Sequence, residues 1–163
     1  MPSADRRDKN ISVSGEHRLK MVQLLFQEMF PNPKIPIQFS RMELDRPVPT
    51  TTFDTYQELK IQYPNKEFYF LIGGDIVGDI ETKWDHGQDL VRLVNFLVFN
   101  RLGYDYPANL SANFLCLDKK VRGPDISSTF IRDLITKGQS TLPYTAATVA
   151  KYIGKLGLYK GAF

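Results

Sequence analysis

The segment 125–132 reads Asp-Ile-Ser-Ser-Thr-Phe-Ile-Arg, which places three hydroxyl groups and one guanidinium at the expected start of a helix. The first turn of a helix leaves backbone N–H groups unpaired and carries a partial positive charge, so such an end binds phosphate readily. Ser128 and Arg132 are four residues apart and share one helix face, which puts the guanidinium beside the hydroxyls. The segment predicts a phosphate site or, as the simpler alternative, an ordinary N-cap.

The size and composition of the chain indicate one globular domain over residues 1–163. The net charge of +3 comes from 21 basic and 18 acidic residues and is too small and dispersed to indicate nucleic-acid binding. The only cysteine, Cys116, excludes a disulfide scaffold and lies in an apolar run that predicts a buried thiol. No apolar run approaches the roughly 20 residues of a membrane span, and the first residues lack a signal-peptide core. We therefore expect a cytoplasmic protein that does not contact membranes.

The hydrophobic periodicity predicts an alternation of strands and helices. Helices are expected over 14–30, 52–63, 89–94, 126–137 and 145–156, and strands over 35–44, 68–72, 96–99 and 113–117. The continuous apolar run at 68–72 is typical of a strand buried on both faces of a parallel sheet. The alternation predicts a doubly wound, Rossmann-like α/β fold. Ligands of such folds bind beyond the carboxyl ends of the strands, where we expect Gly73-Gly74-Asp75, Asn100-Arg101 and the Ser-Ser-Thr turn to converge.

Five segments, taken in order, carry a resemblance to a known family. They are 51–55 (S-Y-T-x-D-T in the family), 71–75 followed by Trp84 (a strand ending in G-x-D, then a tryptophan), 99–103 (a strand ending in R-x-G), 126–132 (I-S-S-T-x-x-R) and the closing helix pattern of 142–159. The chain thereby resembles the nicotinate/nicotinamide mononucleotide adenylyltransferases of the nucleotidyltransferase superfamily. These are doubly wound enzymes that join ATP to a pyridine mononucleotide and release pyrophosphate.

The resemblance implies an ATP site. Arg132 would be the catalytic cation that neutralises charge in the transition state. Gly74 would let the backbone approach the ligand, and Asp75 would accept a hydrogen bond from a ribose hydroxyl or, alternatively, cap a helix. Mg²⁺ is expected mainly on ATP oxygens, with no metal ligands from the protein. The expected ATP-binding residues are Gly74, Asp75, Arg101, Ile126, Ser127, Ser128, Thr129 and Arg132.

The resemblance also implies a site for the pyridine mononucleotide, made by Lys9, Thr52 and Trp84. Trp84, the only tryptophan, suits stacking on the pyridine ring, although a partly buried core side chain is the alternative. Thr52 would hold the ring substituent and would otherwise be a helix cap. Lys9, like Arg101, is a weaker phosphate candidate whose alternative is a solvated surface charge. The residues leave nicotinate and nicotinamide both open, and the resemblance to compact bacterial enzymes favours nicotinate; another nucleotidyltransferase of the superfamily is the second enzyme hypothesis.

One departure from the family is large. The family opens with a strand and G-x-F-x-P-x-H-x-G-H, whereas the two histidines here, His17 and His86, stand outside such a motif and are expected at the surface. Residues 2–9 resemble the loop after the family's second strand, so a βαβ unit of about 30 residues is expected to be missing. The intact later motifs favour a sequence that starts late over a non-catalytic nucleotide-binding or interaction module. Loss of a strand would expose a sheet edge, which predicts self-association.

Overall fold

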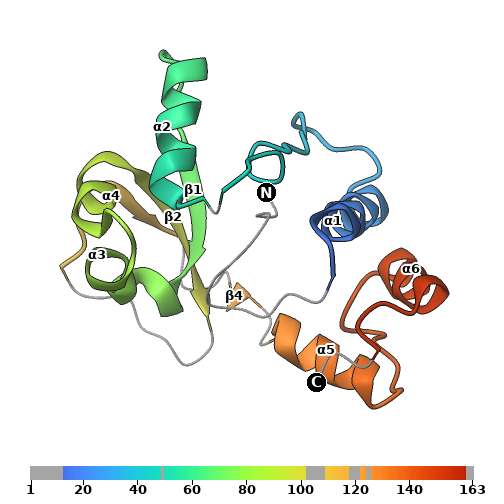
Figure 1. Ribbon diagram of the computed structural model, residues 1–163. Helices are drawn as coiled ribbons and strands as arrows, with labels where there is room; N and C mark the ends of the chain where they lie inside the picture. The colour runs from blue at the N-terminus through green and yellow to red at the C-terminus, as the bar shows by residue number, and fades with distance from the viewer. Residues whose placement is uncertain (1–12, 49, 102–108, 118–121, 124–125, 161–163) are drawn as a thin grey trace. The chain divides into compact units, whose positions relative to one another are not determined.

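The computed structural model of the chain describes residues 13–48, 50–101, 109–117, 122–123 and 126–160 (Figure 1). The chain divides into two compact units. The first consists of Met1–Thr50 together with Ile126–Phe163, and the second is Thr51–Asp125. A single domain over 1–163 stays a prediction, and each unit is described by itself.

The second unit contains a parallel sheet, which confirms the α/β prediction. The sheet order is β1-β2-β3, and β4 also pairs with β2. One row across the sheet joins Phe70, Phe96 and Phe114, which occupy matching register positions. The strands are β1 (Tyr69–Gly73), β2 (Asn95–Arg101), β3 (Phe114–Cys116) and β4 (Arg122–Gly123).

The core of this unit lies on the sheet face that carries Phe96 and Val98, both fully buried. Short helices supply the other half of the core, and Figure 1 shows α3 and α4 next to each other beside the strands. Two of these helices, η1 (Gly74–Asp79) and α3 (Ile80–Lys83), were not predicted, because elements of one or two turns carry too little periodicity. The buried cluster consists of Ile72, Val77, Ile80, Leu90, Val94, Phe96, Val98 and Phe114.

The opposite face of the sheet is apolar but exposed. Leu71, Leu97 and Leu115 form a row across three strands, and Leu71 and Leu115 are 64% and 47% exposed. The prediction that the strand at 68–72 is buried on both faces is therefore wrong, because successive side chains point to opposite faces and the core packs on only one of them. The predicted burial of Cys116 is also wrong: this last residue of the three-residue strand β3 is exposed.

The longer helices are confirmed, with starts that differ from the expected ones by up to two residues. Three of them begin at side-chain caps that the sequence supplies locally, namely Ser14, Thr51 and Ser127. No helix in the described ranges is both long enough and apolar enough to cross a membrane. The helices are α1 (Gly15–Met29), α2 (Thr52–Gln62), α4 (Gly87–Leu93), α5 (Ser128–Thr136) and α6 (Ala147–Leu156).

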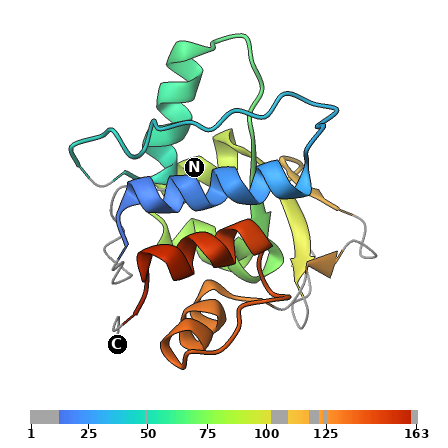
Figure 2. The same cartoon turned by 90° about the vertical axis from the view of Figure 1, so that its right-hand side faces the viewer.

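In the first unit, α1 and α6 lie side by side (Figure 2). Leu19 on α1 and Val149 and Ile153 on α6 are buried apolar residues. Polar contacts hold both ends of the pair. His17 Nδ1 lies 2.8 Å from the hydroxyl of Tyr152, and the carboxylate of Glu28 accepts the first backbone N–H groups of α6 at 3.0 and 2.8 Å.

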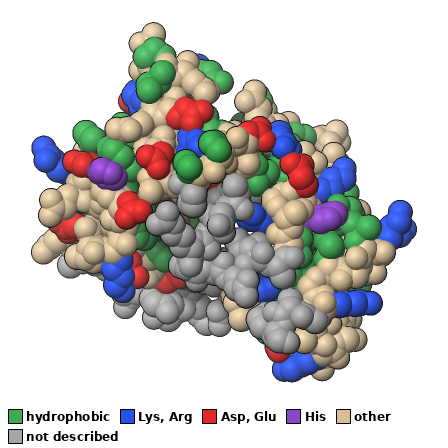
Figure 3. Space-filling view, viewed as in Figure 1, with side chains coloured by type: hydrophobic (Ala, Val, Ile, Leu, Met, Phe, Trp, Pro, Cys, Tyr) green, Lys and Arg blue, Asp and Glu red, His purple; other side chains and the backbone are tan. Residues whose placement is uncertain are grey.

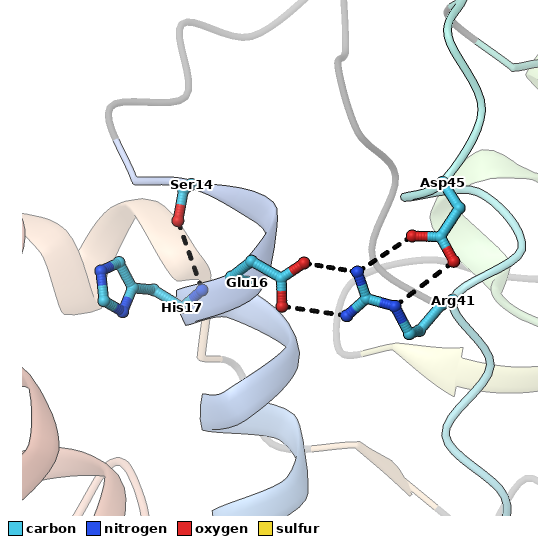
Figure 4. A network of polar contacts seen from close by, with 5 residues as sticks. All are labelled: Ser14, Glu16, His17, Arg41 and Asp45. Atoms are coloured by element: carbon cyan, nitrogen blue, oxygen red, sulfur yellow. Dashed lines mark hydrogen bonds and ion pairs between the residues drawn. The ribbon is translucent and has the colours of Figure 1, made fainter.

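The predicted strand over 35–44 is wrong, because this segment is irregular. Ile35 is 71% exposed, and Pro36 has no N–H to donate to a neighbouring strand. A side-chain network replaces strand pairing (Figure 4). The Arg41 guanidinium donates to both carboxylate oxygens of Glu16 at the start of α1, to one of them at 2.9 Å. It also donates to both carboxylate oxygens of Asp45, at 2.9 and 3.3 Å. These contacts fasten the segment to α1 and hold the pKa of Glu16 below its usual range.

Candidate functional site

The Ser-Ser-Thr turn is the start of α5, as predicted. Ser127 is the N-cap, and its hydroxyl accepts the backbone N–H of Phe130 at 3.1 Å. The N-cap interpretation is therefore correct for Ser127. Ser128 and Thr129 form the first turn, and both are exposed residues at the positive end of the helix dipole. Ile126 precedes the cap and is half-buried.

Arg132 folds back toward the start of its own helix. Its Nη2 donates to the Thr129 hydroxyl at 3.2 Å, so the guanidinium lies beside the first turn of α5. A cation at this end opposes the helix dipole, which is unfavourable unless an anion is bound there. The side chain nevertheless keeps its fork of donors next to a threonine hydroxyl and a helix start, an arrangement that suits phosphate oxygens.

Tyr159 lies within electrostatic reach of two arginines that are far apart in the sequence, Arg132 and Arg18. Burial raises the pKa of Tyr159, while the positive charges of Arg132 and Arg18 oppose that rise. Tyr159 has φ of 64°, and it follows Gly157, which ends α6 in the left-handed conformation with φ of 61°. The first unit thus brings one arginine from α1 and one from α5 into the surroundings of Tyr159. No motif in the sequence points to Arg18, because only the packing of α1 on α6 creates this proximity.

In the second unit, the start of α2 carries a capping box. The Thr51 hydroxyl accepts the N–H of Asp54 at 3.1 Å, and the Asp54 carboxylate accepts the N–H of Thr51 at 2.9 Å. Thr52 is the first residue of the helix and is not its cap, so the cap alternative falls on Thr51 instead. As in any α-helix, the N–H groups of Thr52 and Phe53 have no carbonyl partner one turn earlier inside the helix. They are available to a ligand acceptor that approaches the N-terminal end of α2.

A ring stack brings this helix start to the segment of Trp84. The rings of Phe53 and His86 stack with centroids 4.6 Å apart and an interplanar angle of 20°. Trp84 stands two residues before His86 and packs against the buried core of the unit, as does Phe53. The stack connects the helix start that contains Thr52 with the segment that contains Trp84. A ligand shared by Thr52 and Trp84 stays a prediction. Phe53 and His86, which make the connection, were not among the predicted site residues.

The end of β1 is shaped by a close approach. A Cβ at Gly73 would lie 2.3 Å from Oδ1 of Asp75, so the Asp75 carboxylate folds back over the strand end. Gly74 is buried and starts η1, whose N-cap is Gly73, so the alternative of Asp75 as a helix cap is wrong. Because β1 and β2 are parallel neighbours, these residues leave the same edge of the sheet as Asn100, whose Oδ1 is buried without a hydrogen bond within the described ranges.

Three of the expected placements are not tested by this geometry. Lys9 and the side chain of Arg101 lie outside the described residues, although the backbone of Arg101 ends β2 and pairs with Gly123. The convergence of the Ser-Ser-Thr turn with the ends of the strands stays a prediction, because α5 belongs to the other unit. In the part of the chain that the structure describes, no three His, Cys, Asp or Glu side chains form a cluster that could hold a metal ion.

Comparison with known proteins identifies the family. The model of the cytidylyltransferase-like family matches residues 1–134. A probable nicotinate-nucleotide adenylyltransferase of Lactiplantibacillus plantarum is 33% identical over 153 residues, which cover 94% of this chain and 68% of the relative. The chain belongs to the cytidylyltransferase-like family. The corresponding protein of Enterococcus faecalis is 35% identical and is covered to 65%, so the chain spans about two thirds of the length of these relatives.

Solved structures support the same fold for this cytidylyltransferase-like chain. The nicotinic acid mononucleotide adenylyltransferase of Plasmodium falciparum complexed with NaAD superimposes with a TM-score of 0.70, over 96% of this chain and 78% of that one. A putative nicotinate-nucleotide adenylyltransferase from Vibrio parahaemolyticus gives a TM-score of 0.63. At 22% and 21% identity these matches concern the fold alone. The resemblance predicted from the five segments is confirmed.

Proposed function

We propose that the chain transfers the adenylyl group of ATP to nicotinate mononucleotide and releases pyrophosphate, giving deamido-NAD. The observation that carries the proposal is the start of α5, where Arg132 folds back over Thr129 beside exposed hydroxyls. The names of the relatives support the identity of both substrates. The chain covers about two thirds of those relatives, so the activity itself has to be measured.

On the ATP side, the reaction needs neutralisation of negative charge more than covalent help from the protein. A phosphate oxygen of the mononucleotide attacks the α-phosphorus of ATP in line, and the bond to the pyrophosphate oxygen breaks. Arg132 would bind phosphate oxygens with its fork of donors and stabilise the charge of the departing pyrophosphate. The N–H groups and hydroxyls of Ser128 and Thr129 would hold the same phosphates.

Mg²⁺ would enter with ATP. The ion would be held mainly by phosphate oxygens and water, which is the usual arrangement for Mg²⁺. When bound, the ion screens the charge of the phosphate groups. The protein then has to hold the two substrates in position for the reaction. Asp75 and Asn100, which leave one edge of the sheet, are our candidates for the ribose hydroxyls.

On the pyridine side, the start of α2 and Trp84 would hold the base. The indole ring suits stacking on a flat pyridine ring. The N–H groups of Thr52 and Phe53 would donate to an acceptor on the ring, and the positive end of the α2 dipole favours an anionic one. A carboxylate fulfils both conditions, so the geometry favours nicotinate over nicotinamide.

The test is pyrophosphate release by the chain supplied with ATP, Mg²⁺ and either mononucleotide. We expect turnover with nicotinate mononucleotide and a loss of about 100-fold or more in Arg132→Ala, because such charge donors commonly contribute that much. Arg92→Ala is the matched control, since Arg92 is an exposed arginine at the end of α4 and should be neutral. Absence of turnover with both mononucleotides would refute the activity, and normal turnover in Arg132→Ala would refute the role of Arg132.

A further inference from the structure

His86 has an unusual position next to the proposed base site. Its backbone is left-handed, with φ of 55° and ψ of 33°, and its carbonyl accepts the first hydrogen bond of α4 from Leu90 at 2.9 Å. Its side chain is 56% exposed while one ring face stacks on Phe53. Figure 3 also shows histidine side chains at the molecular surface. The imidazole is therefore fixed in direction by the stack and still accessible to a ligand.

The charged groups nearest to His86 are acidic, and the basic residue of its segment is engaged elsewhere. Asp89 Oδ2 lies 3.7 Å from His86 Nδ1, and the exposed Asp85 precedes it in the chain. Lys83 forms an ion pair with Asp79 at 2.8 Å. From α2, which contributes the stacked Phe53, the nearest charge in the sequence is Asp54, held in the capping box. With Lys83 paired, His86 is the group of this segment, within the described residues, that can present a positive charge to an anionic ligand.

We propose that His86 is a specificity-determining residue that distinguishes a carboxylate from a carboxamide on the pyridine ring. The inference rests on the proposed function and refines it. Phe53 connects the helix start with His86. Its N–H belongs to the first turn of α2, and its ring stacks on the imidazole of His86. A carboxylate at the N-terminal end of α2 would accept hydrogen bonds from the helix start and be attracted by the imidazolium.

A carboxamide would lose part of that stabilisation. It is neutral, so it gains no Coulombic attraction from the imidazolium, and its NH₂ group would meet donors at the helix start. A hydrogen bond to a charged partner is typically stronger than one between neutral groups, and the difference is about tenfold in affinity. We therefore expect wild-type protein to bind nicotinate mononucleotide about tenfold more tightly than nicotinamide mononucleotide.

The experiment measures binding of the two mononucleotides in the absence of ATP. Trp84 is the only tryptophan of the chain, so quenching of its emission reports on this unit, and titration calorimetry provides a second readout. His86→Gln removes the charge and keeps hydrogen-bonding capacity; it should bring the affinity ratio close to one. His86→Lys keeps the charge and should preserve the preference. His17→Gln is the matched control, because the only other histidine belongs to the first unit and contacts Tyr152.

The two variants separate a charge effect from a structural one. His86→Lys keeps a positive charge at this position and should keep the preference, whereas His86→Gln keeps hydrogen-bonding capacity without the charge and should lose it. An unchanged ratio in His86→Gln, equal affinities in the wild type, or no binding of either mononucleotide would overturn the proposal. Selective binding without pyrophosphate release would uphold His86 while the proposed activity fails.

Discussion

Replacement of Gly87 by alanine should destabilise the second unit, because this glycine lies where two helices touch. A Cβ at Gly87 would stand 2.1 Å from the carbonyl oxygen of Ile80 and 2.5 Å from that of Glu81. Both are backbone atoms, so neither can swing aside as a flexible side chain would. Helices α3 and α4 would have to separate by about 1 Å to restore an ordinary contact distance. That movement would disturb Ile80 and Leu90, which are fully buried.

The expected net cost is about 2 kcal/mol. Overpacking a buried contact costs about 3 kcal/mol at the upper end of its usual range, and the alanine returns about 1 kcal/mol by restricting the unfolded chain. With a urea slope near 2 kcal/mol per molar, the midpoint of unfolding should fall by about 1 M. Trp84 emission is a suitable probe, because Trp84 packs against the same core. Its carbonyl also accepts the N–H of Gly87 at 3.0 Å.

The matched control is Gly78→Ala. Gly78 lies in η1 of the same unit, and a Cβ there would meet nothing within 4 Å. Only the effect on the unfolded chain remains, so this variant should be neutral or stabilised by up to about 1 kcal/mol. Equal midpoints for the two variants would refute the reasoning, because the close approach would then carry no energetic consequence. A drop in both midpoints would mean that alanine is disfavoured in these helices for another reason.

Two further changes test contacts that hold each unit together. Hydrogen bonds from Thr148 and Ala147 lower the pKa of Glu28, so the stability they provide is complete above the usual carboxyl value of 4.5 and disappears as the pH falls through the lowered pKa. The thermal unfolding temperature should therefore fall more between pH 7 and pH 3 in wild type than in Glu28→Gln. Equal decreases in the two proteins would contradict this. Asn113 Nδ2 donates to the carbonyl of Val91 at 2.8 Å and to a second carbonyl at the end of α4. Asn113→Asp should therefore lower the free energy of unfolding, measured in urea, by about 3 kcal/mol. The control Asn109→Asp, at an exposed position, should leave that free energy unchanged.

The longer helices could be predicted because their boundaries are encoded locally. Ser14, Thr51 and Ser127 each accept a hydrogen bond from the first turn of the helix that follows, and a cap of this kind is visible in the sequence. The strands depend on partners that a sequence does not name. The alternation at 35–44 resembled a strand, yet the Arg41 network occupies the segment; the apolar run at 68–72 did form a strand, but only one of its faces is buried.

The same distinction applies to the candidate site. Residues within one motif, such as Thr129 and Arg132, meet because a helix brings positions three residues apart together, and the sequence predicts that proximity. Phe53 and His86 meet only through the fold, because the turn that ends in the left-handed His86 exists where Gly87 fits against the carbonyl of Ile80. A contact needed for stability thus also orients the imidazole. If His86 discriminates between acid and amide, that selectivity depends on the close packing of α3 and α4.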